Sequence, residues 1–180
     1  MAKLPNRQPV LKPQDFYLLL ALAALGEQGD QGTTYPELAE YSGLSMSEVH
    51  GALKRAEAAR LLFFDAKRPR ILLPAFKEFL FHGAKYVFPA VRGSMVAGVP
   101  TAHAAPPLDT HIAPSADPAP VWPAIEGTVR GVALIPLYPS APAAALRSPA
   151  LYENLALFDA LRAGNVRERT LAQKLFEDRL

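Results

Sequence analysis

The sequence predicts a mainly α-helical α+β fold, and three observations support this prediction. Apolar residues recur at helical spacing over about 12–88 and again over 150–180. Between these parts, residues 89–149 hold 12 of the 18 prolines, which favours extended chain and turns. Half of the 180 residues are apolar, which is enough for a packed core. We therefore expect a helical head at 1–88, a proline-rich extended middle with short strands at 89–149, and a C-terminal helical hairpin at 150–180.

The composition excludes several kinds of site. Without cysteine, the chain has no disulfides, thiolate zinc sites, iron–sulfur clusters or cysteine nucleophiles. The longest apolar run, Phe16–Leu25, is about half as long as a membrane span requires. Residues 1–14 lack the basic start and the cleavage site of a signal peptide. These observations predict a cytoplasmic protein that does not enter a membrane.

The net charge of +2 does not by itself indicate a nucleic-acid-binding protein. Its distribution is more informative, because the whole excess of positive charge lies within 1–88. Part of that excess is concentrated in Lys67-Arg68-Pro69-Arg70. A local basic cluster attracts phosphate even when the whole molecule is nearly neutral.

Capping and turn residues predict the first helices. Pro13 suits a first helical turn and Gly26 suits a left-handed stop, so we expect a helix over 13–25, buried on nearly all sides. A loop at 29–32 should precede a second helix, which begins at Pro36 and ends at Gly43. A third helix is predicted directly after this turn.

That third helix begins after Ser45, which forms a capping box with Glu48, and we expect it to continue to about Arg60. Two short apolar strands are predicted at 61–64 and 70–73, with a charged turn between them. A further helix is predicted over 74–82, ending at Gly83, and strands over 96–99 and 128–135.

The stretch 100–123 contains seven prolines, which favours polyproline II and opposes any regular hydrogen-bonded element. It is either a linker or an ordered strap over the core. Val121, Trp122 and Ile125 at its end indicate at least one anchored segment. A second proline strap is expected at 136–142, without an assigned role.

Two amphipathic helices are predicted at the C-terminal end. Ser148 caps the first, Gly164 ends it, and Asn165 with Glu168 caps the second. The hairpin must bury its apolar stripe within its own domain, in a homodimer seam or against a partner protein. The residues predicted for a dimer or partner interface are Leu151, Leu155, Phe158, Leu171, Leu175 and Phe176.

Residues 35–54 have a helix-turn-helix pattern. Ala39 is small where the two helices approach, and Gly43 tolerates a positive φ in the turn. The outward face of the third helix then carries small, polar or basic residues and no acidic one: Met46, Ser47, His50, Gly51 and Lys54. A face of this kind can enter a DNA major groove without repelling phosphate, and its polar groups can donate to base edges.

Residues 12–73 resemble winged helix-turn-helix transcriptional regulators, most nearly those of the MarR type. The resemblance lies in Tyr35-Pro36-Glu37-Leu38-Ala39, Ser42-Gly43-Leu44-Ser45, Ser47-Glu48-Val49-His50, Ala52-Leu53-Lys54-Arg55 and Leu61-Leu62. It implies a DNA-binding fold, homodimerisation and a hairpin wing that touches the duplex. DNA contacts are expected at Ser45, Met46, Ser47, His50, Gly51, Lys54, Arg55, Lys67, Arg68 and Arg70. Arg60 occupies the usual place of a helix-ending glycine, so either the helix stops differently or Arg60 is left-handed.

The sequence thus predicts sequence-specific binding of double-stranded DNA by a transcriptional regulator, a homodimeric repressor of the bacterial cytoplasm. The alternative is a protein-interaction module, or an antitoxin or co-regulator that binds a partner protein through its C-terminal half. Aromatic residues are expected either to line a small-molecule pocket or to form the core that joins the two halves: Phe76, Phe79, Phe81, Tyr86 and Phe88.

No catalytic motif is evident, so an enzyme and a cofactor are not expected. His103, Asp109 and His111 have metal-ligand chemistry, but only three candidate ligands are present and prolines interrupt them. We interpret them as ordinary loop residues.

Overall fold

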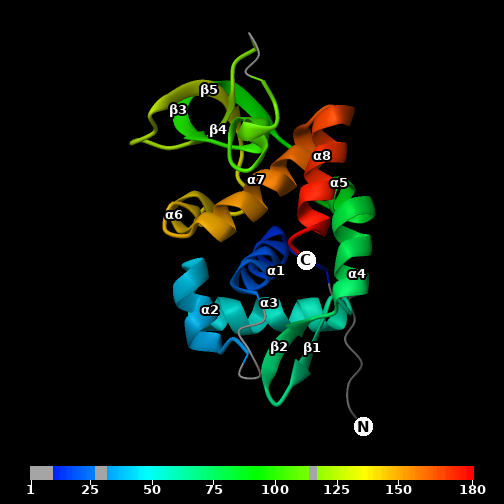
Figure 1. Ribbon diagram of the computed structural model, residues 1–180. Helices are drawn as coiled ribbons and strands as arrows, with labels where there is room; N and C mark the ends of the chain where they lie inside the picture. The colour runs from blue at the N-terminus through cyan, green and yellow to red at the C-terminus, as the bar shows by residue number, and fades with distance from the viewer. Residues whose placement is uncertain (1–9, 27–31, 114–116) are drawn as a thin grey trace.

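The computed structural model describes residues 10–26, 32–113 and 117–180. Its fold is α+β and mainly α-helical, as the sequence predicts. In chain order its elements are α1 (Pro13–Leu25), α2 (Tyr35–Ser42), α3 (Met46–Ala58), β1 (Leu62–Asp65), β2 (Arg68–Ile71), α4 (Leu73–Glu78), a π-helical turn (Phe79–Gly83), α5 (Ala84–Val87), β3 (Arg92–Pro100), β4 (Pro120–Pro123), β5 (Val129–Leu134), α6 (Ala141–Ala145), α7 (Pro149–Ala163) and α8 (Val166–Glu177). Figure 1 shows α1 at the centre, with α2, α3 and the β1–β2 hairpin on one side and α7 leading toward the β3–β5 sheet on the other.

Helix α1 has the predicted bounds and is the central element of the core. All residues from Asp15 to Leu22 are buried, because α1 packs against both α3 and α7. Gly26 ends the helix with a φ of +67°. Most of the predicted loop 29–32 lies outside the described residues.

Local side chains begin and end the next two helices. Thr34 and Ser45 each form a capping box with the glutamate three residues later, so α2 begins one residue earlier than expected. Gly43 takes the predicted left-handed conformation, with φ 69° and ψ 25°. Helix α3 ends at Ala58, and Arg60 is left-handed, with φ 58°. A left-handed residue other than glycine costs about 1–2 kcal/mol.

The hairpin after α3 has a shorter turn than the one predicted between its two strands. Asp65 pairs with Arg68, so only Ala66 and Lys67 connect β1 to β2, and both have positive φ angles. Positive φ at both central residues gives the turn type whose twist matches an antiparallel hairpin. The strand predicted at 70–73 therefore begins two residues earlier, at Arg68.

The helix predicted to end at Gly83 continues to Val87. Gly83 has an ordinary negative φ, and the Ala84 N–H bonds to the Phe79 carbonyl five residues back, which marks the π-helical turn. A Cβ on Gly83 would lie only 2.9 Å from the Phe79 ring. The glycine therefore makes room for an aromatic ring and does not end the helix.

Most of the predicted aromatic residues form the core that joins the two halves. Phe76 and Phe88 are buried beside Phe16, with ring centroids 5.9 and 5.5 Å from it, and Phe158 of α7 lies 5.0 Å from the same ring. Phe79 and Phe81 are partly buried against this cluster, whereas Tyr86 is 75% exposed.

The three strands of the middle region close on themselves. β3 pairs antiparallel with both β4 and β5, and β4 pairs parallel with β5. The closure requires backbone contact at two glycines. A Cβ on Gly98 would overlap the carbonyl oxygen of Trp122, and one on Gly131 would overlap that of Ala119.

The expectation that 100–123 holds no regular hydrogen-bonded element is wrong, because β4 forms within it. Pro120 and Pro123 stand at the two ends of the strand, so Val121 and Trp122 between them still pair with neighbouring strands. Trp122 is 1% exposed and anchors the segment, whereas Ile125 is fully exposed.

The C-terminal helices form where predicted, with Ser148 accepting from the Leu151 N–H and Asn165 in a capping box with Glu168. Their apolar stripe packs within the chain, which is the first of the three alternatives. Leu151, Leu155, Phe158 and Phe176 are buried, and Leu171 and Leu175 pack partly buried against the same core. The chain's own core therefore covers four of these six residues, whereas Leu171 and Leu175 keep part of their surface exposed, and the interface stays a prediction.

Candidate nucleic-acid interface

The outer face of α3 is open to solvent. Ser45, Met46, Ser47, His50 and Lys54 are exposed, and Gly51 is half-buried. The opposite face is fixed on the core through side chains that are almost completely buried: Val49, Ala52, Leu53 and Ala56. Figure 1 shows α3 and the hairpin on the side of the molecule away from the β3–β5 sheet.

Aromatic rings connect this face to the hairpin. The ring of Tyr35 lies 6.1 Å from His50 and 6.3 Å from Phe64, with which it is nearly parallel. The Lys54 Nζ lies 5.2 Å from the centroid of the Phe64 ring and 3.2 Å from Glu57 Oε2. The Lys54–Glu57 pair is exposed and therefore weak, so Lys54 can exchange this partner for another anion.

Arg55 supports α3 from beneath and is not a free phosphate ligand. Its Nε and Nη2 donate to the two carboxylate oxygens of Asp15, at 2.8 and 2.7 Å. Asp15 is completely buried and also accepts from the Lys12 N–H. The hydrogen bonds to Asp15 raise the pKa of Arg55. The predicted phosphate contact at Arg55 is thus corrected to an ion pair that joins α3 to α1.

The three hairpin cations are in different surroundings. Lys67 is exposed at the turn. Arg68 is half-buried and donates from Nη1 to the Gly32 carbonyl. Arg70 is half-buried beside the same backbone, and a Cβ on Gly32 would lie 3.4 Å from its Cζ. Of these three cations, only Lys67 therefore presents its charge at the hairpin tip. The side chain of Arg68 stabilises the backbone at Gly32, which precedes α2.

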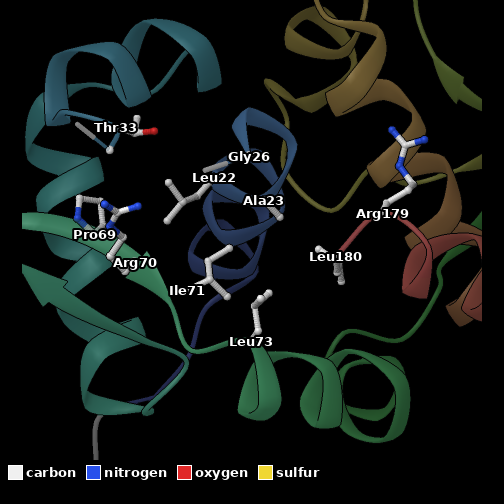
Figure 2. Close-up of a pocket in the computed structure, with 11 residues that line it drawn as sticks. Leu22, Ala23, Gly26, Thr33, Pro69, Arg70, Ile71, Leu73, Arg179 and Leu180 are labelled. Atoms are coloured by element: carbon white, nitrogen blue, oxygen red, sulfur yellow. The ribbon is translucent and has the colours of Figure 1, made fainter. Parts of the chain in front are cut away.

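A cavity of about 130 Å³ lies next to Arg70, between α1, β2 and the last residues of the chain. Figure 2 shows Leu22, Ile71, Leu73 and Leu180 around it, with Arg70 at one side. None of the aromatic residues predicted for an effector pocket lines this cavity.

The residues considered as metal ligands are not assembled into a centre. The His103 Nδ1 lies 3.4 Å from Glu168 Oε1. Within the described ranges, no group of three or more histidine, aspartate or glutamate side chains is arranged to hold a metal ion. Over the same ranges, no helix has the length and apolar character to cross a membrane.

Sequence reasoning missed a group of contacts at the first turn of α3. The Tyr138 hydroxyl donates to Glu48 Oε1 at 3.0 Å, and the Gln14 amide donates to the same oxygen at 2.9 Å. Hydrogen bonds from Ser45 and Tyr138 lower the pKa of Glu48 to about 2. The tyrosine lies 90 residues from the glutamate in sequence, so no local pattern indicates the contact.

Comparison with protein families, with curated proteins and with solved structures found no match to this chain. The functional assignment therefore depends on the geometry described above.

Proposed function

We propose that this protein binds double-stranded DNA in a sequence-specific manner through a winged helix-turn-helix head of the MarR type. In this proposal α2 and α3 are the helix-turn-helix, with Gly43 in its turn, and the β1–β2 hairpin is the wing. Helix α3 enters the major groove, and Lys67 contacts the backbone beside it.

The exposed face of α3 is the observation that carries this proposal. Met46, Ser47, His50 and Lys54 lie open on one side of a helix whose other side is clamped to the core. The acidic residues nearest this face are engaged, because Glu48 caps α3 and Glu57 pairs with Lys54. Serine, histidine and lysine side chains on such a face can donate to base edges or phosphates.

We further propose that the protein acts as a homodimeric repressor in the cytoplasm. One recognition helix covers one half-site, and two-fold symmetry lets a dimer read two. Sedimentation of the full chain, alone and with a selected duplex, tests this part separately. A monomer that binds DNA with one protein per site would overturn the homodimer and leave DNA binding in place.

Charge reversal with duplex-binding measurements tests the DNA proposal. A binding sequence is first selected from random duplexes, and its affinity for the wild type is measured as a function of salt. We expect Lys54→Glu and Lys67→Glu each to weaken binding and to reduce the salt slope by about 1. Lys174→Glu, an exposed lysine on α8, is the matched control and should bind as the wild type does. Absence of any selected duplex, or indifference to both reversals, would refute the proposal.

A further inference from the structure

Residues 136–148 contact the helix-turn-helix from the C-terminal half of the chain. This segment extends the second proline-rich stretch, 136–142, and is here called the strap. The Tyr138 ring stacks on Tyr17 of α1, with centroids 5.7 Å apart and 16° between the planes. Its hydroxyl donates to Glu48 Oε1 and accepts from the Gln14 amide at 3.0 Å. The other oxygen of Glu48 accepts from the Ser45 N–H and hydroxyl at the start of α3. One carboxylate thus joins the helix cap to the strap.

The strap also contacts the turn between α2 and α3. The Ser42 carbonyl accepts from the Tyr17 hydroxyl at 2.6 Å and from the Ser140 hydroxyl at 3.3 Å. The Tyr41 and Ser148 hydroxyls are 2.6 Å apart and share a hydrogen bond. Both sides of the turn are therefore held by residues 138–148, in addition to their own local bonds.

The other end of the strap is anchored in the C-terminal half. Ala141, Ala144 and Ala145 of α6 are buried, and α6 packs on α7. On α7, Asp159 accepts from Trp122 Nε1 of β4 at 2.6 Å. A continuous set of contacts therefore runs from the sheet through α7 and the strap to the first turn of α3.

We propose that Tyr138 is a positioning residue through which the C-terminal half sets the first turn of α3 relative to the duplex. This inference rests on the proposed DNA binding. The first turn presents Met46 and Ser47, and the N-terminal residues of a recognition helix are those that contact base edges. Freedom in this turn should reduce discrimination between sequences more than it reduces phosphate binding, since phosphate contacts carry no sequence information directly.

Two matched tyrosine variants test this inference. Tyr138→Phe keeps the ring stack and removes the hydroxyl that reaches Glu48. Tyr152→Phe is the control, because its hydroxyl donates to the Pro100 carbonyl at 2.7 Å and its ring lies 5.6 Å from Trp122, away from α3. We expect Tyr138→Phe to lower affinity for the selected duplex about tenfold, in keeping with loss of a bond to a charged group. Affinity for unrelated duplex and the salt slope should stay as in the wild type.

Amide hydrogen exchange provides a readout that needs no DNA. Exchange at Glu48 and Val49, whose N–H groups bond to Ser45, should become faster in Tyr138→Phe and remain unchanged in Tyr152→Phe, at equal melting temperature. Ser140→Ala, which removes the longer bond to Ser42, should act in the same direction and less strongly. If the wild type binds no duplex, the proposed function fails, while exchange still reports whether Tyr138 fixes the turn.

Two results would overturn the positioning role of Tyr138. One is wild-type exchange at Glu48 and Val49 in Tyr138→Phe. The other is an equal loss of affinity for selected and unrelated duplexes, which would indicate a general structural effect.

Discussion

Each half of the molecule contains a buried aspartate paired with an arginine, and the two pairs differ in their exposure to solvent and in what they stabilise. In the head, Asp15 holds Arg55 from 40 residues away, and Arg55 keeps 27% of its side chain exposed. In the C-terminal half, Asp159 holds Arg162 within one turn of α7, and only 4% of that arginine side chain is exposed. The first pair supports a helix whose other face stays open, whereas the second lies wholly inside the fold.

The same contrast holds for the apolar surfaces of the two halves. The stripes of α7 and α8 pack within the chain, while the outer face of α3 keeps polar and basic groups in solvent. An amphipathic sequence pattern alone does not distinguish a helix that packs within the chain from a helix with a face available for binding, because both regions show helical periodicity. From this difference we propose that the interface lies on the head and that the C-terminal half supports it.

Removal of the two aspartates should give the largest effect and tests the contrast directly. Asp159→Ala leaves Thr101, Trp122 and Arg162 without the acceptor that they share, all in a buried environment. Breaking such a pair from one side costs about 3–5 kcal/mol. Asp15→Ala should cost less, because water can reach the part of Arg55 that is exposed. Urea unfolding measures both, and an equal or larger loss for Asp15→Ala would contradict the contrast.

Alanine at two glycines should give smaller effects of opposite sign. Gly131→Ala places a methyl group against the Ala119 carbonyl, and overpacking of this kind costs about 1–3 kcal/mol. Gly51 lies in the middle of α3, where a Cβ would meet only the end of the Arg55 side chain at 3.2 Å. Gly51→Ala should therefore stabilise the protein by about 0.5–1 kcal/mol.

Thermal and urea unfolding of the two glycine variants measure these changes in the free energy of unfolding. Destabilisation by Gly51→Ala would show that Arg55 is too firmly held by Asp15 to yield. A neutral Gly131→Ala would show that the closed sheet can relax.

The sequence predicted those features that neighbouring residues determine. Pro13 and Gly26 mark the ends of α1, and the Ser45–Glu48 pair marks the start of α3, because a cap needs only residues within one turn. For the same reason the sequence could predict a left-handed Arg60 as one of two alternatives, and Arg60 is left-handed in the structure. Residues on the outer face of α3 follow from helical periodicity once its start is known.

The features that the sequence did not predict depend on distant partners. β4 forms because Trp122 finds both β3 and a buried Asp159, whereas prolines dominate the local pattern. Gly83 has the sequence appearance of a helix stop and instead leaves space for Phe79. Arg55 has the pattern of a phosphate contact, and only the fold brings it to Asp15.

The smallest expected effect concerns acid stability at the junction of the two halves. Glu48 has a folded pKa of about 2, below its ordinary value of 4.5, mainly through hydrogen bonds from Ser45 and then from Tyr138. A lowered folded pKa gives stability that is present above pH 4.5 and is lost as the pH falls toward 2. Glu48→Gln should therefore lose less stability than the wild type across this window, as urea midpoints at each pH would show.

Tyr138→Phe sharpens the same measurement, because it removes one of the bonds that lower the pKa of Glu48 and leaves the Ser45 cap in place. A carboxyl NMR titration should then place the Glu48 midpoint between the wild-type value and 4.5, since the cap still favours the ionised form. Tyr152→Phe should leave the midpoint unchanged, because its hydroxyl bonds to Pro100. An unshifted midpoint in Tyr138→Phe would mean that the strap adds nothing to the cap, and the head would then stand without support from the C-terminal half at this helix.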